Sequence, residues 1–184
     1  MTAPSNETRS PIRIDLPGVV QRRGHTCGAA ALLAICRHYG VGPRSERRVV
    51  RDMGFGKAGS DPRHVLRAVR RYGLSHEEVQ PMTIAQLRER LELRRPVMMM
   101  LQAWADPPPA SYATHWRDGH WVVAIGHDPA GIYFADPWLE GARGYLDDAE
   151  LDERWHDLEG KRDRRVDHYG LVLWRPALDV RRIA

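Results

Sequence analysis

Hydrophobic residues in the first half of the chain recur at helical spacing between residues that favour helix ends. The longest such run is residues 27–39, CGAAALLAICRHY, which is apolar on almost every side and is followed by Gly40. This pattern predicts a buried central helix that ends at the glycine, because glycine readily adopts the left-handed conformation found after helices. Further helices are predicted at residues that favour helix starts: Ser45, Asp61 with Pro62, Thr83 with Gln86, and Asp148. The last of these helices would present three apolar residues on one face, Leu151, Trp155 and Leu158.

Shorter apolar runs dominate the second half of the chain and are typical of β-strands. They cover residues 97–102, 120–126, 131–135 and 170–174. Because helices come first and strands follow, we expect an α+β fold with an antiparallel sheet. Residues 103–119 include three consecutive prolines and predict a long surface loop, of the kind that forms a lid or sets specificity.

The runs at 120–126 and 131–135 are separated by His-Asp-Pro-Ala, which favours a tight turn and therefore an antiparallel hairpin. In such a hairpin the numbers of paired residues have a constant sum, which places His120 opposite Asp136 at the open end. Directly opposite residues have Cβ atoms about 5 Å apart. A carboxylate at position 136 is therefore expected to orient the imidazole of His120.

A chain of 184 residues has the usual length of one domain, and 42% hydrophobic with 28% charged residues is typical of a globular protein. We expect residues 1–15 to form a flexible N-terminal segment and residues 16–184 to form a single domain. The polar start of the chain does not resemble a signal peptide, and no apolar run approaches the roughly 20 residues of a membrane span. We therefore expect a cytoplasmic protein without a membrane span.

Charge and cysteine content exclude several classes of protein. Lys and Arg number 28 against 24 Asp and Glu, a net charge of +4, and only Lys57 and Lys161 are lysines. Arginine pairs are scattered along the chain near acidic residues, whereas a nucleic-acid interface gathers basic and aromatic residues into one patch, so we expect no nucleic-acid partner. With two cysteines, Cys27 and Cys36, the chain is neither a disulfide-dense scaffold nor a four-cysteine zinc protein.

Cys27 stands at the start of the predicted central helix, where the helix dipole stabilises a thiolate. Together with His120 and Asp136 it supplies a nucleophile, a base and a group that orients the base. Gln21 lies six residues ahead of Cys27, from where its side-chain amide is expected to donate to an oxyanion beside the Cys27 N–H. Cys36 falls nine residues after Cys27, on the opposite side of the helix, and is expected to be packed in the core.

These motifs resemble the bacteriocin-processing, double-glycine-leader peptidase family of papain-like cysteine proteases. The resemblance extends from about residue 16 to residue 174 and rests on a set of short motifs: Gln21, Cys27-Gly28-Ala29, Tyr39-Gly40, the segment from Gly59-Ser60 to Gly73-Leu74, Pro96, Gly119-His120-Trp121-Val122-Val123 and Asp136-Pro137. It implies a papain-like fold in which a helical N-terminal part, with the cysteine on its buried central helix, packs on a C-terminal antiparallel sheet.

The resemblance also implies a chemistry and its residues. The activity would be cleavage of a peptide or protein substrate in peptide maturation, without a cofactor. The roles would be nucleophile for Cys27, general base for His120, orienting residue for Asp136 and oxyanion-hole donor for Gln21.

The chain departs from the family pattern just before the cysteine. Many members carry an acidic residue there, where this chain has Thr26, and His25 is not part of the pattern. Many members also form the first domain of a peptide-exporting transporter, whereas this sequence contains no membrane span and no phosphate-binding loop, so we expect a free-standing member. A double-glycine leader as substrate, and a separate transporter or other chain as partner, are left open.

Other functions are compatible with the same residues. Acyl-thioester chemistry would also serve a papain-like acyltransferase or a glutamine or asparagine deamidase, and a non-catalytic peptide-binding module would leave Cys27 an ordinary thiol. A zinc site formed by His25, Cys27 and His115 or His120 lacks paired-ligand spacing, so no metal is expected. The tryptophans near the proposed site would be mainly core residues, with some lining a substrate groove: Trp104, Trp116, Trp121 and Trp138.

Overall fold

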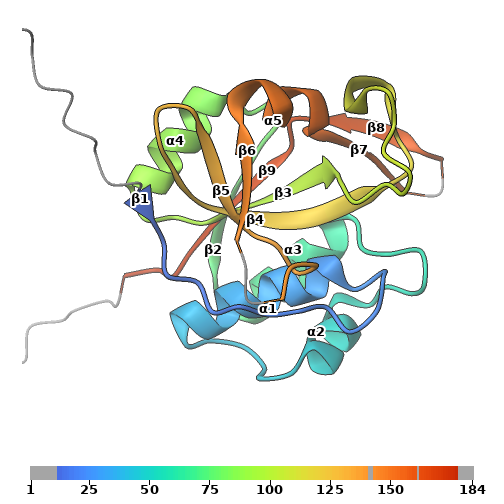
Figure 1. Ribbon diagram of the computed structural model, residues 1–184. Helices are drawn as coiled ribbons and strands as arrows, with labels where there is room; N and C mark the ends of the chain where they lie inside the picture. The colour runs from blue at the N-terminus through green and yellow to red at the C-terminus, as the bar shows by residue number, and fades with distance from the viewer. Residues whose placement is uncertain (1–11, 141–142, 161, 178–184) are drawn as a thin grey trace, which may run out of the picture.

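The computed structural model describes residues 12–140, 143–160 and 162–177, and these residues form the expected α+β fold (Figure 1). Seven strands build one antiparallel sheet: β1 (Ile12–Arg13), β2 (Ser75–Val79), β3 (Val97–Gln102), β4 (Gly119–His127), β5 (Gly131–Ala135), β6 (Gly144–Asp147) and β9 (Gly170–Trp174). Their order is β2-β9-β3-β4-β5-β6, and β1 pairs with β4. A separate pair consists of β7 (His156–Glu159) and β8 (Arg164–Asp167). The four predicted strands are all present.

Helices lie on both sides of this sheet (Figure 1). They are α1 (Cys27–Tyr39), α2 (Glu46–Met53), α3 (Pro62–Arg71), α4 (Ile84–Glu92) and α5 (Asp148–Arg154). In Figure 1, α1 to α3 lie below the sheet, whereas α4 and α5 lie above it. None of the helices in the described part of the chain is both long and apolar enough to span a bilayer.

The central helix α1 has the predicted bounds. Every residue from Cys27 to Cys36 is buried, and the helix packs against β4. Gly40 ends it in the left-handed conformation, with φ of 66°, and donates its N–H to the carbonyl of Cys36. Since the helix is surrounded by other elements, its start holds Cys27 in a fixed position relative to the sheet.

The last helix is shorter than predicted. α5 ends at Arg154, and Leu158, which was expected on its apolar face, lies instead in β7. Trp155 is fully buried, and its indole N–H donates to the carbonyl of Tyr169 at 3.0 Å. The chain leaves the helix there because residues 156–159 pair with β8, a long-range contact that the local pattern does not encode.

The start of the domain involves residues ahead of position 16. Residues 1–11 of the predicted flexible segment lie outside the described residues. Ile12 and Arg13 form β1 against β4, and Ile14 is buried. The described part of the domain therefore begins earlier in the chain than the predicted boundary, and the division into a flexible segment and one domain stays a prediction.

The register of the β4–β5 hairpin differs from the predicted one. Val123 pairs with Ala135, and the ladder shifts by one residue at a β-bulge between Ala124 and Gly126. Continued outward, this register brings Asp136 beside Val122, two residues away from the predicted position opposite His120. The direct pairing was wrong because Gly126 lies opposite Tyr133 rather than Gly131, and the bulge offsets only one residue of this difference. A displacement of two residues nevertheless keeps both side chains on the same face of the hairpin.

Candidate active site

Cys27 is the first residue of α1 and its side chain is 7% exposed. The first N–H groups of a helix have no acceptor within the helix, so this end carries positive potential beside the thiol. Thr26 does not cap the helix with its side chain. Its hydroxyl donates instead to the carbonyl of Arg23 at 2.9 Å, which fixes the turn that leads into the helix.

A glycine must follow this cysteine. A Cβ at Gly28 would lie 2.2 Å from the Ser60 hydroxyl and 3.0 Å from Cδ1 of Trp121. Trp121 is 3% exposed and donates its indole N–H to the Ser60 carbonyl at 2.8 Å. The start of α1 can therefore approach β4 this closely only because residue 28 has no side chain.

His120, in β4, and Asp136, directly after β5, form a buried pair. Nε2 of His120 lies 2.6 Å from Oδ1 of Asp136, and each side chain is 7% exposed. A carboxylate can only accept, so Nε2 carries the proton of this bond. The other ring nitrogen, Nδ1, is left for the thiol of Cys27, which is near enough to raise the pKa of the ring.

The surroundings of His120 change its basicity. Burial alone would lower the pKa of this imidazole, but the hydrogen bonds with Asp136 and Cys27 and the charges of both partners raise its pKa from 6.5 to about 9. An imidazole with this pKa stays protonated at neutral pH as long as the anions beside it persist. The site is therefore built to stabilise a positive charge on His120.

Asp136 accepts hydrogen bonds on both carboxylate oxygens. The backbone N–H of Trp138 donates to Oδ1 at 2.8 Å, and the indole N–H of Trp104 donates to Oδ2 at 3.0 Å. Trp121 is a core residue, whereas Trp104 is 47% exposed and Trp138 is 52% exposed. Trp104 lines a cavity, which agrees with the expectation that some of the tryptophans line a groove. The sequence did not predict the hydrogen bond from Trp104 to Asp136, because this bond joins a loop to a residue far along the chain.

Gln21 lies beside the segment that carries Asp136. Its backbone N–H donates to the carbonyl of Pro137 at 2.9 Å, and its side-chain N–H donates to the carbonyl of Arg23 at 2.9 Å. The side chain is buried, and within the described residues its Oε1 has no hydrogen-bond partner. The amide is thus held in place by the carbonyl of Arg23.

Asp157, in β7, is a second buried carboxylate near His120. Its Oδ1 accepts from the Leu158 N–H at 2.7 Å and from Nε2 of Gln102 at 3.2 Å. Burial raises its pKa to about 7, although both hydrogen bonds and the charge of His120 act in the opposite direction. The sequence pattern did not indicate this residue, because it predicted a helix through Leu158 where the chain forms β7.

The remaining cysteine is remote from this chemistry. Cys36 is completely buried in the core and unpaired, as expected. Burial raises the pKa of its thiol to about 12. Any thiolate reactivity at neutral pH would therefore come from Cys27.

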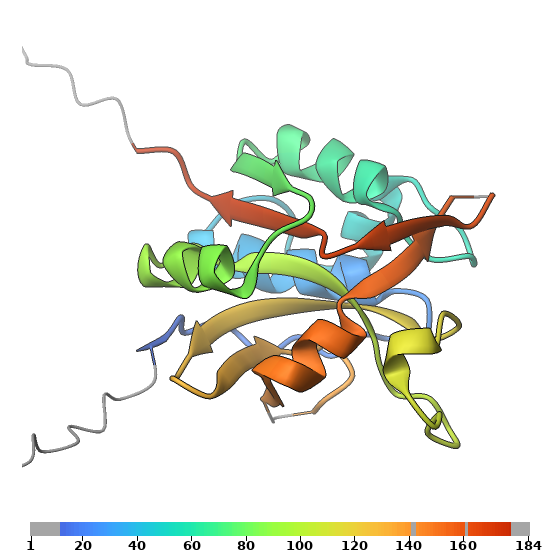
Figure 2. The ribbon, with the colours of Figure 1, turned by 90° about the horizontal axis from the view of Figure 1, so that it is seen from above.

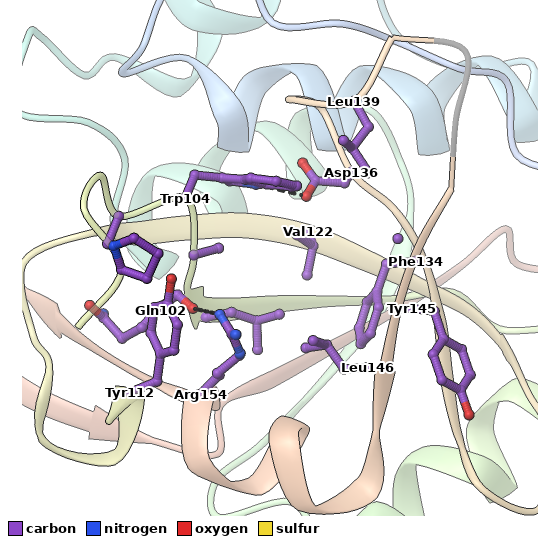
Figure 3. A pocket seen from close by; sticks show the side chains of 15 residues that line it. Gln102, Trp104, Tyr112, Val122, Phe134, Asp136, Leu139, Tyr145, Leu146 and Arg154 are labelled. Atoms are coloured by element: carbon purple, nitrogen blue, oxygen red, sulfur yellow. Dashed lines mark hydrogen bonds between the residues drawn. The ribbon is translucent and has the colours of Figure 1, made fainter. Parts of the chain in front are cut away.

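A cavity of about 410 Å³ lies next to Asp136 (Figure 3). Apolar side chains of the sheet form its floor, among them Val122, Phe134 and Leu146. Trp104 and Asp136 lie side by side along one side of the cavity in Figure 3. Within the described ranges, no cluster of three or more His, Cys, Asp or Glu side chains is arranged to hold a metal ion.

A cysteine at the start of a buried helix, facing a histidine and an aspartate carried by an antiparallel sheet, defines the papain-like class of fold. Within this class the chain belongs to the Peptidase_C39 like family, whose family model matches residues 13–162. This match confirms the resemblance inferred from the sequence motifs.

Solved structures of peptidase domains share the fold. A C39-like peptidase from Bacillus anthracis is 10% identical with a TM-score of 0.70, and the match covers 92% of this chain and 100% of that one. The peptidase domain of Streptococcus ComA, a bifunctional ABC transporter, is 16% identical with a TM-score of 0.65, and the match covers 86% of this chain and 97% of that domain. A double glycine motif protease from an AMS/PCAT transporter, solved with its leader peptide, is 23% identical with a TM-score of 0.56, covering 89% and 96%. A comparison with curated proteins found no match.

Proposed function

We propose that this protein is a cysteine peptidase that cleaves peptide substrates through a triad of Cys27, His120 and Asp136. The observation that carries the proposal is the buried 2.6 Å bond between Nε2 of His120 and Oδ1 of Asp136. Cys27, at the start of α1, is near enough to this ring to raise the pKa of His120. Nucleophile, base and orienting group are thus joined in the order that thiol peptidases need.

In the proposed reaction, His120 takes the proton of Cys27, and the thiolate attacks the carbonyl carbon of the scissile bond. The resulting tetrahedral intermediate collapses as the C–N bond breaks, and the His120 imidazolium gives its proton to the departing amine. A water molecule, deprotonated by His120, then attacks the thioester, and the thiolate leaves. Asp136 holds the ring in the tautomer with the proton on Nε2 throughout, which keeps Nδ1 available to the sulfur.

The oxyanion formed in both steps needs donors beside the sulfur. The backbone N–H of Cys27 is one, because it opens α1 and has no acceptor within the helix. We assign the second to the remaining N–H of the Gln21 side chain, whose amide is buried and held by Arg23. Loss of one such donor typically lowers turnover by a factor of about 10² to 10³.

Leader peptides are the first substrates to test. A relative of the same fold was solved in complex with a leader peptide, and another is the peptidase domain of a transporter. We therefore propose that this chain acts on leader peptides of peptide precursors. A panel of such peptides, with and without a double-glycine site, separates this narrow proposal from general peptidase activity.

The experiment that tests the chemistry is alkylation of the cysteines by iodoacetamide between pH 4 and pH 9, followed by intact-mass spectrometry. We expect fast labelling of Cys27 well below the ordinary thiol pKa of about 8.5, and loss of this low-pH labelling in His120→Ala. Cys36 is the internal control, since it is buried and its pKa is about 12. Slow labelling of Cys27 with ordinary pH dependence in both proteins would contradict the proposal and favour a peptide-binding module.

Product masses distinguish the reactions that share a thioester. Hydrolysis of a peptide bond yields two fragments that together contain one added water, whereas transfer to an amine yields a conjugate. Deamidation changes the mass of an intact peptide by about one dalton. Fragments that are absent with Cys27→Ala would support the peptidase.

A further inference from the structure

The carboxylate of Asp136 is held by three donors from three parts of the chain. Oδ1 accepts from Nε2 of His120 at 2.6 Å and from the backbone N–H of Trp138 at 2.8 Å, while Oδ2 accepts from the indole N–H of Trp104 at 3.0 Å. The Asp136 side chain is 7% exposed, so water has little access to either oxygen. Trp104 is thus the donor that satisfies the oxygen facing away from His120.

The backbone at Trp104 is shaped for this contact. Its φ is 66°, in the left-handed region that bulky side chains rarely occupy. β3 ends two residues earlier, and Ala103 still donates its N–H to the carbonyl of Asp118 at 3.0 Å. At Trp104 the chain turns away from this pairing, and the indole ring extends toward Asp136 across the top of the cavity (Figure 3). An unfavourable backbone conformation beside a reactive site is a common sign of a functional constraint.

The rest of the same loop is anchored to other elements. The guanidinium of Arg154 lies 3.5 Å from the centre of the Tyr112 ring, and the rings of Trp116 and His156 lie 4.1 Å apart. These contacts place the loop beside the β7–β8 pair, as both overall views show (Figures 1 and 2). The loop therefore has its own supports, and the half-exposed Trp104 is not needed to hold it in place.

We propose that Trp104 is a positioning residue of the triad, acting through Asp136 on His120. The inference rests on the proposed function. Its physical basis is that a buried carboxylate oxygen without a donor is unstable. Without the indole N–H, the Asp136 carboxylate turns toward water, and its bond to His120 weakens. The His120 ring then loses the contact with Asp136 that favours its protonated form. As a result, the ion pair between His120 and Cys27 is destabilised.

Trp104→Phe tests this inference, since it keeps one aromatic ring and removes the indole N–H together with the second ring. Trp116→Phe is the matched control, being the same substitution in the same loop, at a ring that contacts His156. For the wild type and both variants, the pKa of His120 is measured by NMR of the ring nitrogens, the rate of Cys27 alkylation is measured at pH 6, and Tm is recorded.

We expect Trp104→Phe to move the pKa of His120 toward 6.5 and to slow alkylation of Cys27 by about tenfold, the effect of losing one hydrogen bond to a charged group. Trp116→Phe should change neither. The inference is overturned if His120 titrates in Trp104→Phe as in the wild type. It is also overturned if the rate of Cys27 alkylation falls equally in both variants, in proportion to a fall in Tm. Ordinary reactivity of Cys27 in the wild type would instead contradict the proposed function, and the His120 titration would still decide the role of Trp104.

Discussion

The pKa of His120 gives a quantitative test of the site. Raising it from 6.5 to about 9 stabilises the imidazolium by about 3 kcal/mol relative to the neutral ring. Asp136→Ala removes the anion and the hydrogen bond on Nε2, whereas the burial that lowers the pKa and the influence of Cys27 that raises it both remain. We therefore expect the pKa of His120 to fall from about 9 toward 6.5, by about 1 to 2.

The assay is a pH titration of the ring nitrogens by NMR, combined with alkylation of Cys27 at pH 6. A fall of this size would reduce the population of the thiolate–imidazolium pair by roughly one to two orders of magnitude, with a matching loss of labelling rate. Asp152→Ala is the control, because Asp152 contacts His168 at 3.1 Å in a comparable but exposed pair. A His120 pKa that stays near 9 in Asp136→Ala, or lies near 6.5 in the wild type, would refute the reasoning.

Three further substitutions have defined outcomes. Gly119→Ala places a Cβ 2.2 Å from the Asp157 carboxylate, beside His120, so we expect a loss of about 1 to 3 kcal/mol in thermal unfolding and slower Cys27 labelling. Adding Asp157→Ala should restore the thermal stability and the rate of Cys27 labelling. A double variant that is as unstable and as slowly labelled as Gly119→Ala would contradict this steric explanation. Asp157 has a raised pKa, so its contribution to stability is complete below about pH 4 and is lost as the pH rises through about 7. Asp157→Asn should therefore raise the free energy of unfolding at pH 8 by up to about 4 kcal/mol, and equal urea curves for the two proteins would disprove it. Cys36→Ala should cost about 1 kcal/mol in urea unfolding and leave Cys27 labelling unchanged; altered labelling would mean that Cys36 is coupled to the site.

The elements predicted to the residue are those whose local pattern is strong. The helix at 27–39 and the strands at 97–102, 131–135 and 170–174 have the bounds that the sequence indicated. Each is a run of apolar residues with its own end signal, such as Gly40 after α1. Burial of such a run stabilises the same element in almost any fold, so local information suffices.

Elements with polar sequences were missed because their partners stabilise them. β2 reads SHEEV and has no apolar alternation, yet it pairs with β9 along its whole length. Similarly, residues 156–159 continue an apparent helical pattern but form β7 against β8. The register of the β4–β5 hairpin was also decided by tertiary structure, since a bulge depends on how the sheet curves.

Local sequence patterns were enough to single out the candidate site residues Gln21, Cys27, His120 and Asp136, because these residues stand in short motifs on strongly patterned elements. The surroundings of these residues depend on long-range contacts. The indole N–H on Asp136 and the buried carboxylate of Asp157 come from a loop and a strand far apart in the chain. Hydrogen bonds and desolvation act over a few ångströms in space, and a local sequence pattern carries no information on which distant side chains reach that distance.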